Sequence, residues 1–416
     1  MPDFDYKEKR FEHDIEEYLT TKGGYEKGNP KSFDRKLALD VNTFISFIKT
    51  SQPKAWERFE KIYGADSERQ IIDRFCREVK MVGLLKVFRQ GFTDRGIKFR
   101  AVFFKPETTI NPTTMEQYNA NILHCTRQLH YLLQNENSID IVLFINGIPV
   151  VSMELKCQFT GQNADNAIKQ YKFDRATKDT LFEFKNRVLV HFAVDLSNVY
   201  MTTKLEGANT YFLPFNQGSN GAGNVGGKGN PVNSDGYDTA YLWEQVLCKE
   251  RLLEILHKYL HLQVERDEKG NVKSEQMIFP RYHQLDVVTK LLADVKKNGS
   301  GRNYLIQHSA GSGKSNSIAW LAHQLIGLET DDGELVVDTV LVVTDRVILD
   351  KQIRDTIKQF MQVGNTVAWA EHSGDLRNAI KGGKRIVVST IEKFPFILPD
   401  LGAEHKNNRF AIIIDE

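Results

Sequence analysis

The chain has 416 residues, which is too long for one ordinary domain and predicts about two to four domains. Hydrophobic residues make up 41% of the sequence and charged residues 26%, a globular composition that excludes disordered and fibrous classes. The 55 Lys and Arg residues balance the 54 Asp and Glu residues, giving a net charge of +1. The overall charge therefore argues neither for nor against nucleic-acid binding, which would need a local patch.

Neither membrane insertion nor secretion is expected from the apolar pattern. The longest apolar runs, such as residues 141–145 and 411–414, are far shorter than the ~20 residues that span a bilayer. The first fourteen residues alternate in charge and contain no apolar signal core. The four cysteines, Cys76, Cys125, Cys157 and Cys248, form no CxxC pair, so no zinc site from local pairs and no disulfide framework is expected. We therefore expect a cytoplasmic protein.

Residues 1–265 mix helical and strand patterns and are expected to form the first domain. The clearest feature is a strand pair over 139–145 and 148–155, joined by Asn146 and Gly147, a strong hairpin signal. The other elements expected here are helices over 9–19, 71–79, 163–174 and 241–260, and strands over 84–88, 97–104 and 187–194. A Gly- and Asn-rich segment over 216–236 is expected to be a long loop.

A charged linker over 266–275 is expected to precede a second domain over 276–416. In that domain strands and helices alternate, which predicts a parallel α/β sheet. Its expected strands cover residues 303–307, 337–344, 366–370, 385–389 and 410–415.

The sharpest local motif is HSAGSGKS, which follows an apolar run and precedes a helical pattern, the context of a phosphate-binding P-loop. Gly311 and Gly313 allow backbone N–H groups to turn around phosphate oxygens. Lys314 could reach the β- and γ-phosphates, and the Ser315 hydroxyl could hold Mg²⁺. The nucleotide-binding residues predicted here are His308, which stands where glycine is usual, Ser309, Ala310, Gly311, Ser312, Gly313, Lys314 and Ser315.

Two further segments support a nucleotide site. Residues 411–416, AIIIDE, form an apolar run that ends in Asp415 and Glu416. Asp415 is expected to hold a metal ion through water, and Glu416 to polarise the attacking water. Gln284 precedes Lys314 by 30 residues and could read adenine through its amide, although a surface glutamine is the alternative.

A second candidate site lies in the first domain. On the strand over 150–156, Glu154 and Lys156 share one face, and the hairpin can bring Asp140 beside Glu154. Two carboxylates that share Mg²⁺ beside an ammonium group suit phosphodiester cleavage, because the metal helps to generate hydroxide and the lysine stabilises developing charge. Glu-x-Lys occurs four times in the chain, so its spacing alone is uninformative. A solvated charged face is the alternative.

Other charged residues could serve this site. Lys169, Lys172 and Arg175 follow on the next helix and could reach a phosphate. Glu12 and Glu16 share one face of the first helix. They could supply an additional acid to the metal site or be surface charges, and the sequence leaves both readings open.

This order of motifs resembles the restriction (motor) subunit of Type I restriction–modification enzymes, over essentially the whole chain. The resemblance implies a PD-(D/E)xK nuclease-like α/β domain, followed by the first RecA-like parallel α/β domain of a superfamily 2 helicase, truncated at motif II. Asp140, Glu154 and Lys156 match the family's nuclease triad. The resemblance also implies DNA contacts from a Gln-x-x-x-Tyr motif: Tyr171 matches its tyrosine, and Gln170 is adjacent to it. Ala167 stands where the motif's glutamine would be.

The helicase resemblance implies two further DNA contacts, by Arg346 within residues 340–352 and by Thr390 within 390–394. The implied activity is Mg²⁺-dependent cleavage of double-stranded DNA coupled to ATP-driven translocation. A specificity subunit would read the target, and a methyltransferase subunit would protect it. Because the second motor lobe is missing, we expect an N-terminal fragment that does not translocate. The alternatives are a DNA-repair nuclease-helicase without these partners and a non-catalytic nucleotide-binding scaffold.

Overall fold

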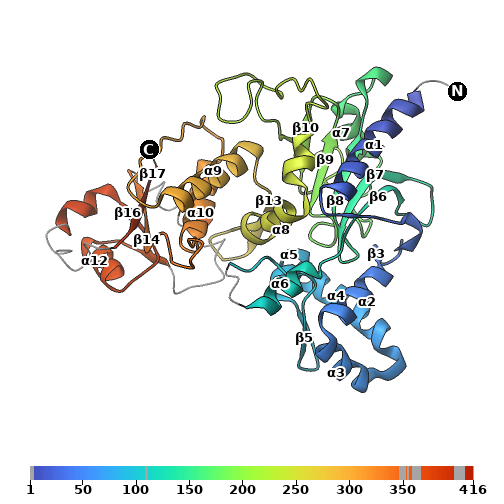
Figure 1. The fold of residues 1–416 in the computed structure, drawn as a ribbon, viewed down its shortest axis with the longest axis horizontal. Helices are drawn as coiled ribbons and strands as arrows, with labels where there is room; N and C mark the ends of the chain where they lie inside the picture. The colour runs from blue at the N-terminus through green and yellow to red at the C-terminus, as the bar shows by residue number, and fades with distance from the viewer. Residues whose placement is uncertain are drawn as a thin grey trace. The chain divides into compact units, whose positions relative to one another are not determined.

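The computed structural model describes residues 4–107, 111–345, 353, 356–357, 367–397 and 408–415. The chain forms two compact units. The first comprises Met1–Leu260 with Gln276–Phe279, and the second His261–Glu275 with Pro280–Glu416. Both units combine helices with a β-sheet, so the predicted α/β class is confirmed (Figure 1).

A seven-stranded mixed sheet forms the centre of the first unit, in the order β1-β6-β7-β8-β9-β10-β11. β7 (Ser138–Ile145) and β8 (Ile148–Leu155) form the predicted hairpin and are buried along almost their whole length. β8 pairs in parallel with β9 (Val190–Val194), whereas β7 is antiparallel to both of its neighbours. The remaining strands are β1 (Glu26–Lys27), β6 (Leu123–His130), β10 (Val199–Thr202) and β11 (Leu213–Pro214).

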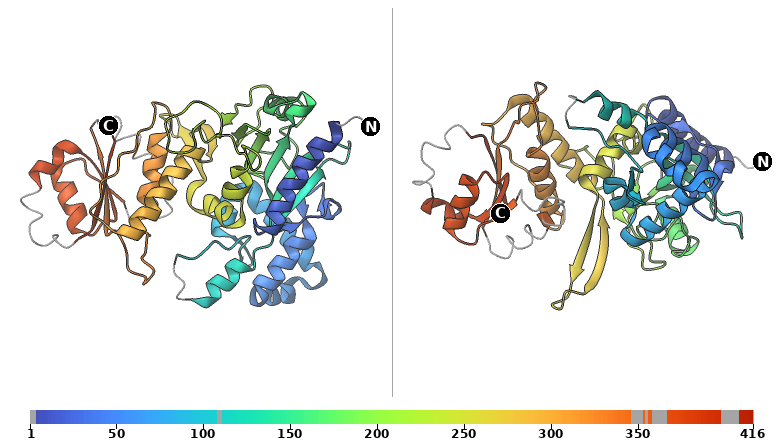
Figure 2. Two further views of the ribbon diagram at one scale, coloured as in Figure 1. Left: turned by 45° about the horizontal axis from the view of Figure 1, so that its top comes forward. Right: turned by 90° about the horizontal axis from the view of Figure 1, so that it is seen from below.

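Two helices contact the strands of this hairpin, as can be followed in Figures 1 and 2. α1 (Phe4–Thr21) packs against β6 and β8, and α7 (Ala164–Phe173) packs against β8 and β9. Phe11, Ile15 and Leu19 of α1 are fully buried, which confirms the helical spacing read from the sequence. Asn163 caps the start of α7 by accepting a hydrogen bond from the backbone of Asp165.

A helical layer in the first unit corrects two sequence predictions. Residues 84–88 are not a strand but the start of α5 (Leu84–Gln90), because Leu84, Leu85, Val87 and Phe88 have helical spacing and are all buried. The strand predicted over 97–104 ends at Phe99, as β5 (Ile97–Phe99) paired with β4 (Phe92–Asp94). The other helices of the layer are α2 (Val41–Ser51), α3 (Pro53–Tyr63) and α4 (Ser67–Val82).

Three segments complete the first unit. α6 covers Pro112–Asn119, and the predicted loop over 216–236 contains no helix or strand. Hydrogen bonds cross that loop, for example from Gly218 N to Gly229 O at 2.8 Å. The single helix predicted over 241–260 is interrupted: α8 (Lys249–Glu254) lies between π-helical turns over Leu242–Val246 and Ile255–Tyr259.

The segment expected to be a linker, 266–275, is ordered as part of a β-hairpin. β12 (His261–Arg266) pairs with β13 (Val272–Ile278), and Asp267 closes the turn by accepting hydrogen bonds from the backbone of Lys269 and Asn271. The charged residues that suggested a linker are exposed on this hairpin, except Glu275, which is half-buried. High charge alone therefore did not distinguish a solvated hairpin from a linker.

The second unit contains a parallel sheet in the order β15-β16-β14-β17, which confirms four of its five predicted strands. The strands are β14 (Thr339–Thr344), β15 (Val367–Trp369), β16 (Ile386–Thr390) and β17 (Phe410–Asp415). Val340 and Val342 belong to one core cluster with α10, whereas Leu341 belongs to another with α12, so helices cover both faces. The helices are α9 (Tyr282–Asn298), α10 (Lys314–Leu325) and α12 (Ser373–Lys381).

The strand predicted over 303–307 is wrong. Among the described residues no strand pairs with this segment, and Leu305 is 93% exposed. β17 lies at the edge of the described sheet, with Ile412 and Ile414 exposed by 60% and 63%. An apolar run becomes a strand only where a neighbour accepts its backbone hydrogen bonds, and composition cannot reveal that neighbour.

Within the described ranges, no helix is long and apolar enough to cross a bilayer. All four cysteines are free.

Candidate active site

The β7–β8 hairpin sets the geometry of the candidate nuclease site. Ile141 pairs with Met153, so continuing this register one step brings Asp140 opposite Glu154. The Asn146–Gly147 turn closes the hairpin, with Gly147 at a φ of +79° that favours glycine. A β-bulge between Leu143 and Phe144 shifts the register by one residue before the strands reach the acids. The structure therefore brings together the two acids that the sequence selects.

Asp140 is buried, and three groups hold its carboxylate. Its Oδ2 accepts a hydrogen bond from the backbone N–H of Leu155 at 2.7 Å, and its Oδ1 accepts one from the Gln128 amide at 3.2 Å. The ammonium of Lys156 lies 4.0 Å from Oδ2. These contacts orient Asp140 from both neighbouring strands.

Glu154 is completely buried, and its two oxygens have different surroundings. Oε1 accepts a hydrogen bond from Arg175 Nε at 2.8 Å and forms an ion pair with Arg175 Nη2 at 2.7 Å, whereas buried Oε2 has no hydrogen-bond partner. Burial, and then the negative charge of Asp140, raise the pKa of Glu154 well above its usual range, although Arg175 and Lys156 oppose the shift. A buried carboxylate oxygen without a donor can receive a cation.

Lys156 completes the carboxylate–lysine cluster, a name used below for Asp140, Glu154 and Lys156. Its Nζ lies 3.2 Å from Oε1 of Glu8 on α1. Burial alone would lower the pKa of Lys156, but the charges of Asp140, Glu8 and Glu154 outweigh burial and raise it. The ammonium group is therefore positively charged at neutral pH.

Helix α1 supplies further acids to this region. Glu12 is buried and shares the Gln128 amide with Asp140, at 2.8 Å from its own Oε1. Burial and the charge of Asp140 raise the pKa of Glu12 to about 7. Glu16 lies farther along the helix, 3.5 Å from Arg127 and 3.2 Å from Lys27. The sequence left open whether Glu12 or Glu16 joins the metal site, and Glu12 is the one that lies beside Asp140.

The sequence analysis gave no role to three residues that lie at this site. Glu8 continues the four-residue spacing of Glu12 and Glu16, so helical periodicity could have found it. Gln128 and Arg127 reach α1 from β6, with Arg127 Nε 3.3 Å from Glu12. No local pattern predicts a contact between residues 116 positions apart.

Helix α7 corrects one predicted DNA contact. Tyr171 is completely buried, and its hydroxyl lies 2.8 Å from Ser152 Oγ, which is also 2.8 Å from His191 Nδ1. This burial does not allow the Tyr171 side chain to contact DNA directly. Arg175 was expected to reach a phosphate, but its side chain is only 3% exposed and contacts Glu154.

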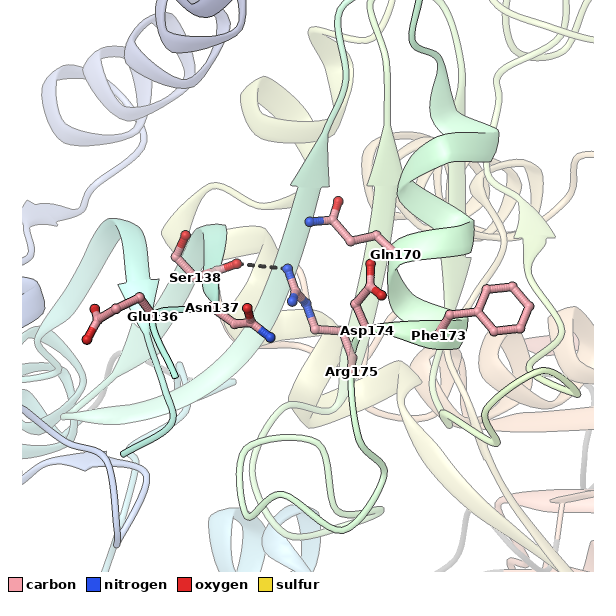
Figure 3. Close-up of a pocket in the computed structure, with 7 residues that line it drawn as sticks. All are labelled: Glu136, Asn137, Ser138, Gln170, Phe173, Asp174 and Arg175. Atoms are coloured by element: carbon pink, nitrogen blue, oxygen red, sulfur yellow. Dashed lines mark hydrogen bonds between the residues drawn. The ribbon is translucent and has the colours of Figure 1, made fainter. Parts of the chain in front are cut away.

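Gln170 borders two pockets beside the carboxylate–lysine cluster. One, of about 550 Å³, also has Ser138 and Arg175 in its wall (Figure 3). The other, of about 460 Å³, includes Lys156 and Lys169. A DNA contact by Gln170 stays a prediction that its position allows.

In the second unit, residues 308–315, predicted to be a P-loop and called the P-loop below, lie at the start of α10. Lys314 is the first residue of the helix, and Gly313 precedes it with a φ of +82°. Gln284 is buried and donates from Nε2 to the carbonyl oxygens of Ser312 and Gly313, at 3.1 and 2.9 Å, while its Oε1 accepts from Arg281 N. Its amide is thus engaged by the P-loop backbone, so Gln284 is not a surface glutamine, and its contact with adenine stays a prediction.

The other predicted nucleotide-binding residues surround this turn. The His308 ring lies 5.0 Å from that of His283, which contacts the Ser312 carbonyl. The Ser312 hydroxyl is buried without a hydrogen-bond partner. Ser309, Ala310 and Gly311 are exposed, and Gly313, Lys314 and Ser315 are half-buried.

Asp415 ends β17 close to this loop. Burial raises its pKa, and the positive charge of Lys314 opposes the shift, so the two predicted nucleotide-site residues interact. Thr344 pairs with both Asp415 and Thr390 at the ends of three parallel strands. Thr390 is only 6% exposed, which leaves little of its side chain for the predicted DNA contact.

Two predicted residues, Arg346 and Glu416, lie outside the described residues. Within the described part of the chain, no group of three or more His, Cys, Asp or Glu side chains is arranged to hold a metal ion. Any metal bound at either site would therefore need water, backbone or substrate oxygens as further ligands.

Comparison with protein families identifies both parts of the chain. Residues 283–416 match the SWI2/SNF2 ATPase family, and residues 5–210 match the Type I restriction enzyme R protein N terminus. The combination defines a restriction-enzyme N-terminal domain followed by a helicase-like ATPase domain. Residues 5–210 therefore carry the N-terminal domain of Type I restriction enzyme R proteins.

Individual relatives agree with this assignment. One relative is a Methanocaldococcus jannaschii protein provisionally named as the type I restriction enzyme MjaVIIIP endonuclease subunit. The two sequences are 26% identical over 252 residues, and the match covers 57% of this chain and 21% of that protein. It is 24% identical over 290 residues to the same organism's provisionally named MjaIXP endonuclease subunit, covering 66% and 25%. The chain thus spans about a quarter of the length of these relatives.

Proposed function

We propose that this chain acts as the restriction subunit of a Type I restriction enzyme, cleaving double-stranded DNA with Mg²⁺ and coupling cleavage to ATP-driven translocation. The observation that carries the proposal is the carboxylate–lysine cluster, formed by β7, β8 and the residue that follows β8, within the segment that matches the R protein N terminus. The names of the relatives as endonuclease subunits support the same reading.

The acids of the first unit fit a divalent cation. Glu154 offers a buried oxygen, Oε2, without a hydrogen-bond donor, and the Asp140 carboxylate lies opposite. Asp140 and Glu154 would hold Mg²⁺, and Glu12 is the candidate for a further acid because it shares Gln128 with Asp140. When bound, the metal would act as a Lewis acid on phosphate and lower the pKa of water.

The chain's own residues would orient and stabilise the DNA phosphate. Lys156 carries a positive charge that can stabilise the negative charge developing on phosphorus-bound oxygens. Glu8 holds that ammonium in place at 3.2 Å. Gln170 and Lys169, in the walls of the adjoining pockets, are suited to contact the DNA backbone.

In the second unit, ATP would bind at the start of α10. The backbone of Gly311–Gly313 and the side chain of Lys314 would hold the phosphates, and Ser315 and Asp415 would hold the Mg²⁺ of the nucleotide. Glu416 remains the predicted group to polarise the attacking water. We further propose a cytoplasmic complex in which a specificity subunit reads the target and a methyltransferase subunit protects it.

The test uses Glu154→Gln and Lys156→Ala in the full-length chain, assembled with purified methyltransferase and specificity subunits. Each change should lower ATP- and Mg²⁺-dependent cleavage of unmethylated plasmid by about 100-fold or more, the effect typical of removing one transition-state group. Glu183→Gln and Lys185→Ala, in a second Glu-x-Lys pair, are the matched controls and should cleave normally.

Two results would favour the other readings. Unchanged cleavage by Glu154→Gln and Lys156→Ala would favour a non-catalytic scaffold. Full cleavage without the specificity and methyltransferase subunits would favour a repair nuclease-helicase.

A further inference from the structure

We propose that Arg175 is a positioning residue for Glu154, which it holds by one oxygen so that the other is presented to the metal ion. The inference rests on the proposed nuclease function. Both guanidinium contacts go to Oε1, at 2.8 Å from Nε and 2.7 Å from Nη2. Oε2 is buried and has no donor.

Arg175 is itself fixed from two directions. It directly follows Asp174, the C-terminal cap of α7, whose backbone N–H is hydrogen-bonded to the Gln170 carbonyl. Its Nη2 also donates to the backbone carbonyl of Ser138 at 2.8 Å, as Figure 3 shows. Ser138 begins β7, two residues before Asp140. One buried side chain therefore connects the end of α7 to the two strands that carry the acids.

The geometry determines which oxygen is available. Rotation of the carboxylate would break the hydrogen bond from Nε to Oε1 and the ion-pair contact of Oε1 with Nη2, so Arg175 holds the carboxylate in one orientation. Glu154 is thereby prepared to bind a cation through Oε2 alone. Residues that orient metal ligands typically change metal affinity or activity by about 10–100-fold when they are replaced.

The experiment measures Mn²⁺ binding to the whole chain without nucleotide or DNA, by electron paramagnetic resonance of free Mn²⁺. Arg175→Gln should weaken the Glu154-dependent binding by about 10–100-fold. Arg175→Lys keeps the positive charge but has one nitrogen in place of the two that contact Glu154. Its Mn²⁺ affinity should therefore lie between those of Arg175→Gln and wild type. The matched control is Arg74→Gln, which breaks a remote Arg–Glu pair with Glu78 on α4 and should leave Mn²⁺ binding unchanged.

A double-mutant cycle separates positioning from general support of the fold. If Arg175 acts through Glu154, adding Arg175→Gln to Glu154→Gln should cause no further loss of Mn²⁺ affinity. Circular dichroism confirms folding of each variant. Should Arg175→Gln fail to fold, a loss of affinity in Arg175→Lys, with Arg74→Lys unchanged, supports the proposal.

The outcomes distinguish this inference from the proposed function. Folded Arg175 variants that bind Mn²⁺ like wild type, while Glu154→Gln does not, would overturn the positioning role alone. If Glu154→Gln itself binds Mn²⁺ normally, the metal site and hence the proposed nuclease function fail as well.

Discussion

His191 provides the sharpest test of how the first unit is stabilised beneath the candidate site. It lies on β9 opposite Ser152 of β8, is 1% exposed, and lies 2.8 Å from the Ser152 hydroxyl through Nδ1. Burial lowers the pKa of His191 from 6.5 to about 3. Because the folded-state pKa is depressed, the neutral imidazole contributes stability above pH 6.5, and this contribution is lost as the pH falls toward 3.

The magnitude follows from the pKa difference. At about 1.36 kcal/mol per pKa unit, a depression from 6.5 to about 3 corresponds to about 5 kcal/mol in total. Roughly half of it should disappear between pH 7 and pH 4.5. His191→Gln keeps an amide for Ser152 but does not titrate. The wild-type advantage in unfolding free energy over this variant should therefore shrink by about 2–3 kcal/mol across that interval.

Urea unfolding at pH 7 and pH 4.5, followed by circular dichroism and tryptophan fluorescence, measures this difference. His13→Gln is the control, because the His13 side chain on α1 is 56% exposed and its replacement should leave the pH dependence of wild type intact. If wild type and His191→Gln lose stability in parallel between the two pH values, the attribution of acid sensitivity to buried His191 is refuted.

Three further predictions concern the turn and the P-loop. Gly147→Ala should destabilise the protein by about 2–4 kcal/mol in urea unfolding, because its Cβ would meet the Asp40 carbonyl, whereas Gly96→Ala, with open space around it, should cost only about 1 kcal/mol. Gln284→Ala removes two hydrogen bonds to the P-loop backbone and should weaken binding of a fluorescent ATP analogue by about tenfold; unchanged affinity would exclude a role in holding the loop. Lys314→Ala should reduce the same affinity by at least about tenfold, and normal binding would argue against the proposed phosphate site.

Local patterns predicted the part of the candidate site that depends on local structure. The Asn146–Gly147 turn and its flanking apolar runs specify an antiparallel hairpin. The register shift between Leu143 and Phe144, which aligns Asp140 with Glu154, is not visible in that pattern. The same reasoning failed for residues 84–88, whose short apolar run fits either a strand or a helix. Periodicity is reliable where a turn signal limits the alternatives.

Contacts between distant segments could not be predicted in this way. Lys156 pairs with Glu8 across 148 positions, and Gln128 joins Glu12 to Asp140 through an irregular position of β6 with a φ of +48°. These contacts exist because α1 packs on the sheet, and its docking site is a property of the tertiary fold.

Motif resemblance also identified residues without revealing how they act. Tyr171 and Gln284 occupy positions expected to contact DNA and adenine, yet both side chains are buried and hydrogen-bonded to other parts of the protein. Each supports a neighbouring element: Tyr171 connects α7 to β8 through Ser152, and Gln284 holds the P-loop backbone. Burial decides whether a motif residue can touch a ligand, and a single sequence does not report burial.

The charge balance around the hairpin explains why this region is suited to a cation. Its interacting acids outnumber its bases: Glu8, Glu12, Glu16, Asp140 and Glu154 face Lys27, Arg127, Lys156 and Arg175. Burial and the charge of Asp140 raise the pKa of both Glu12 and Glu154, so full ionisation of the acids is unfavourable without additional positive charge. A divalent cation would supply that charge, and its binding should release protons. Proton release on Mn²⁺ addition at pH 7, measured in a weakly buffered solution and absent in Glu154→Gln, would link the electrostatics of the site directly to the proposed chemistry.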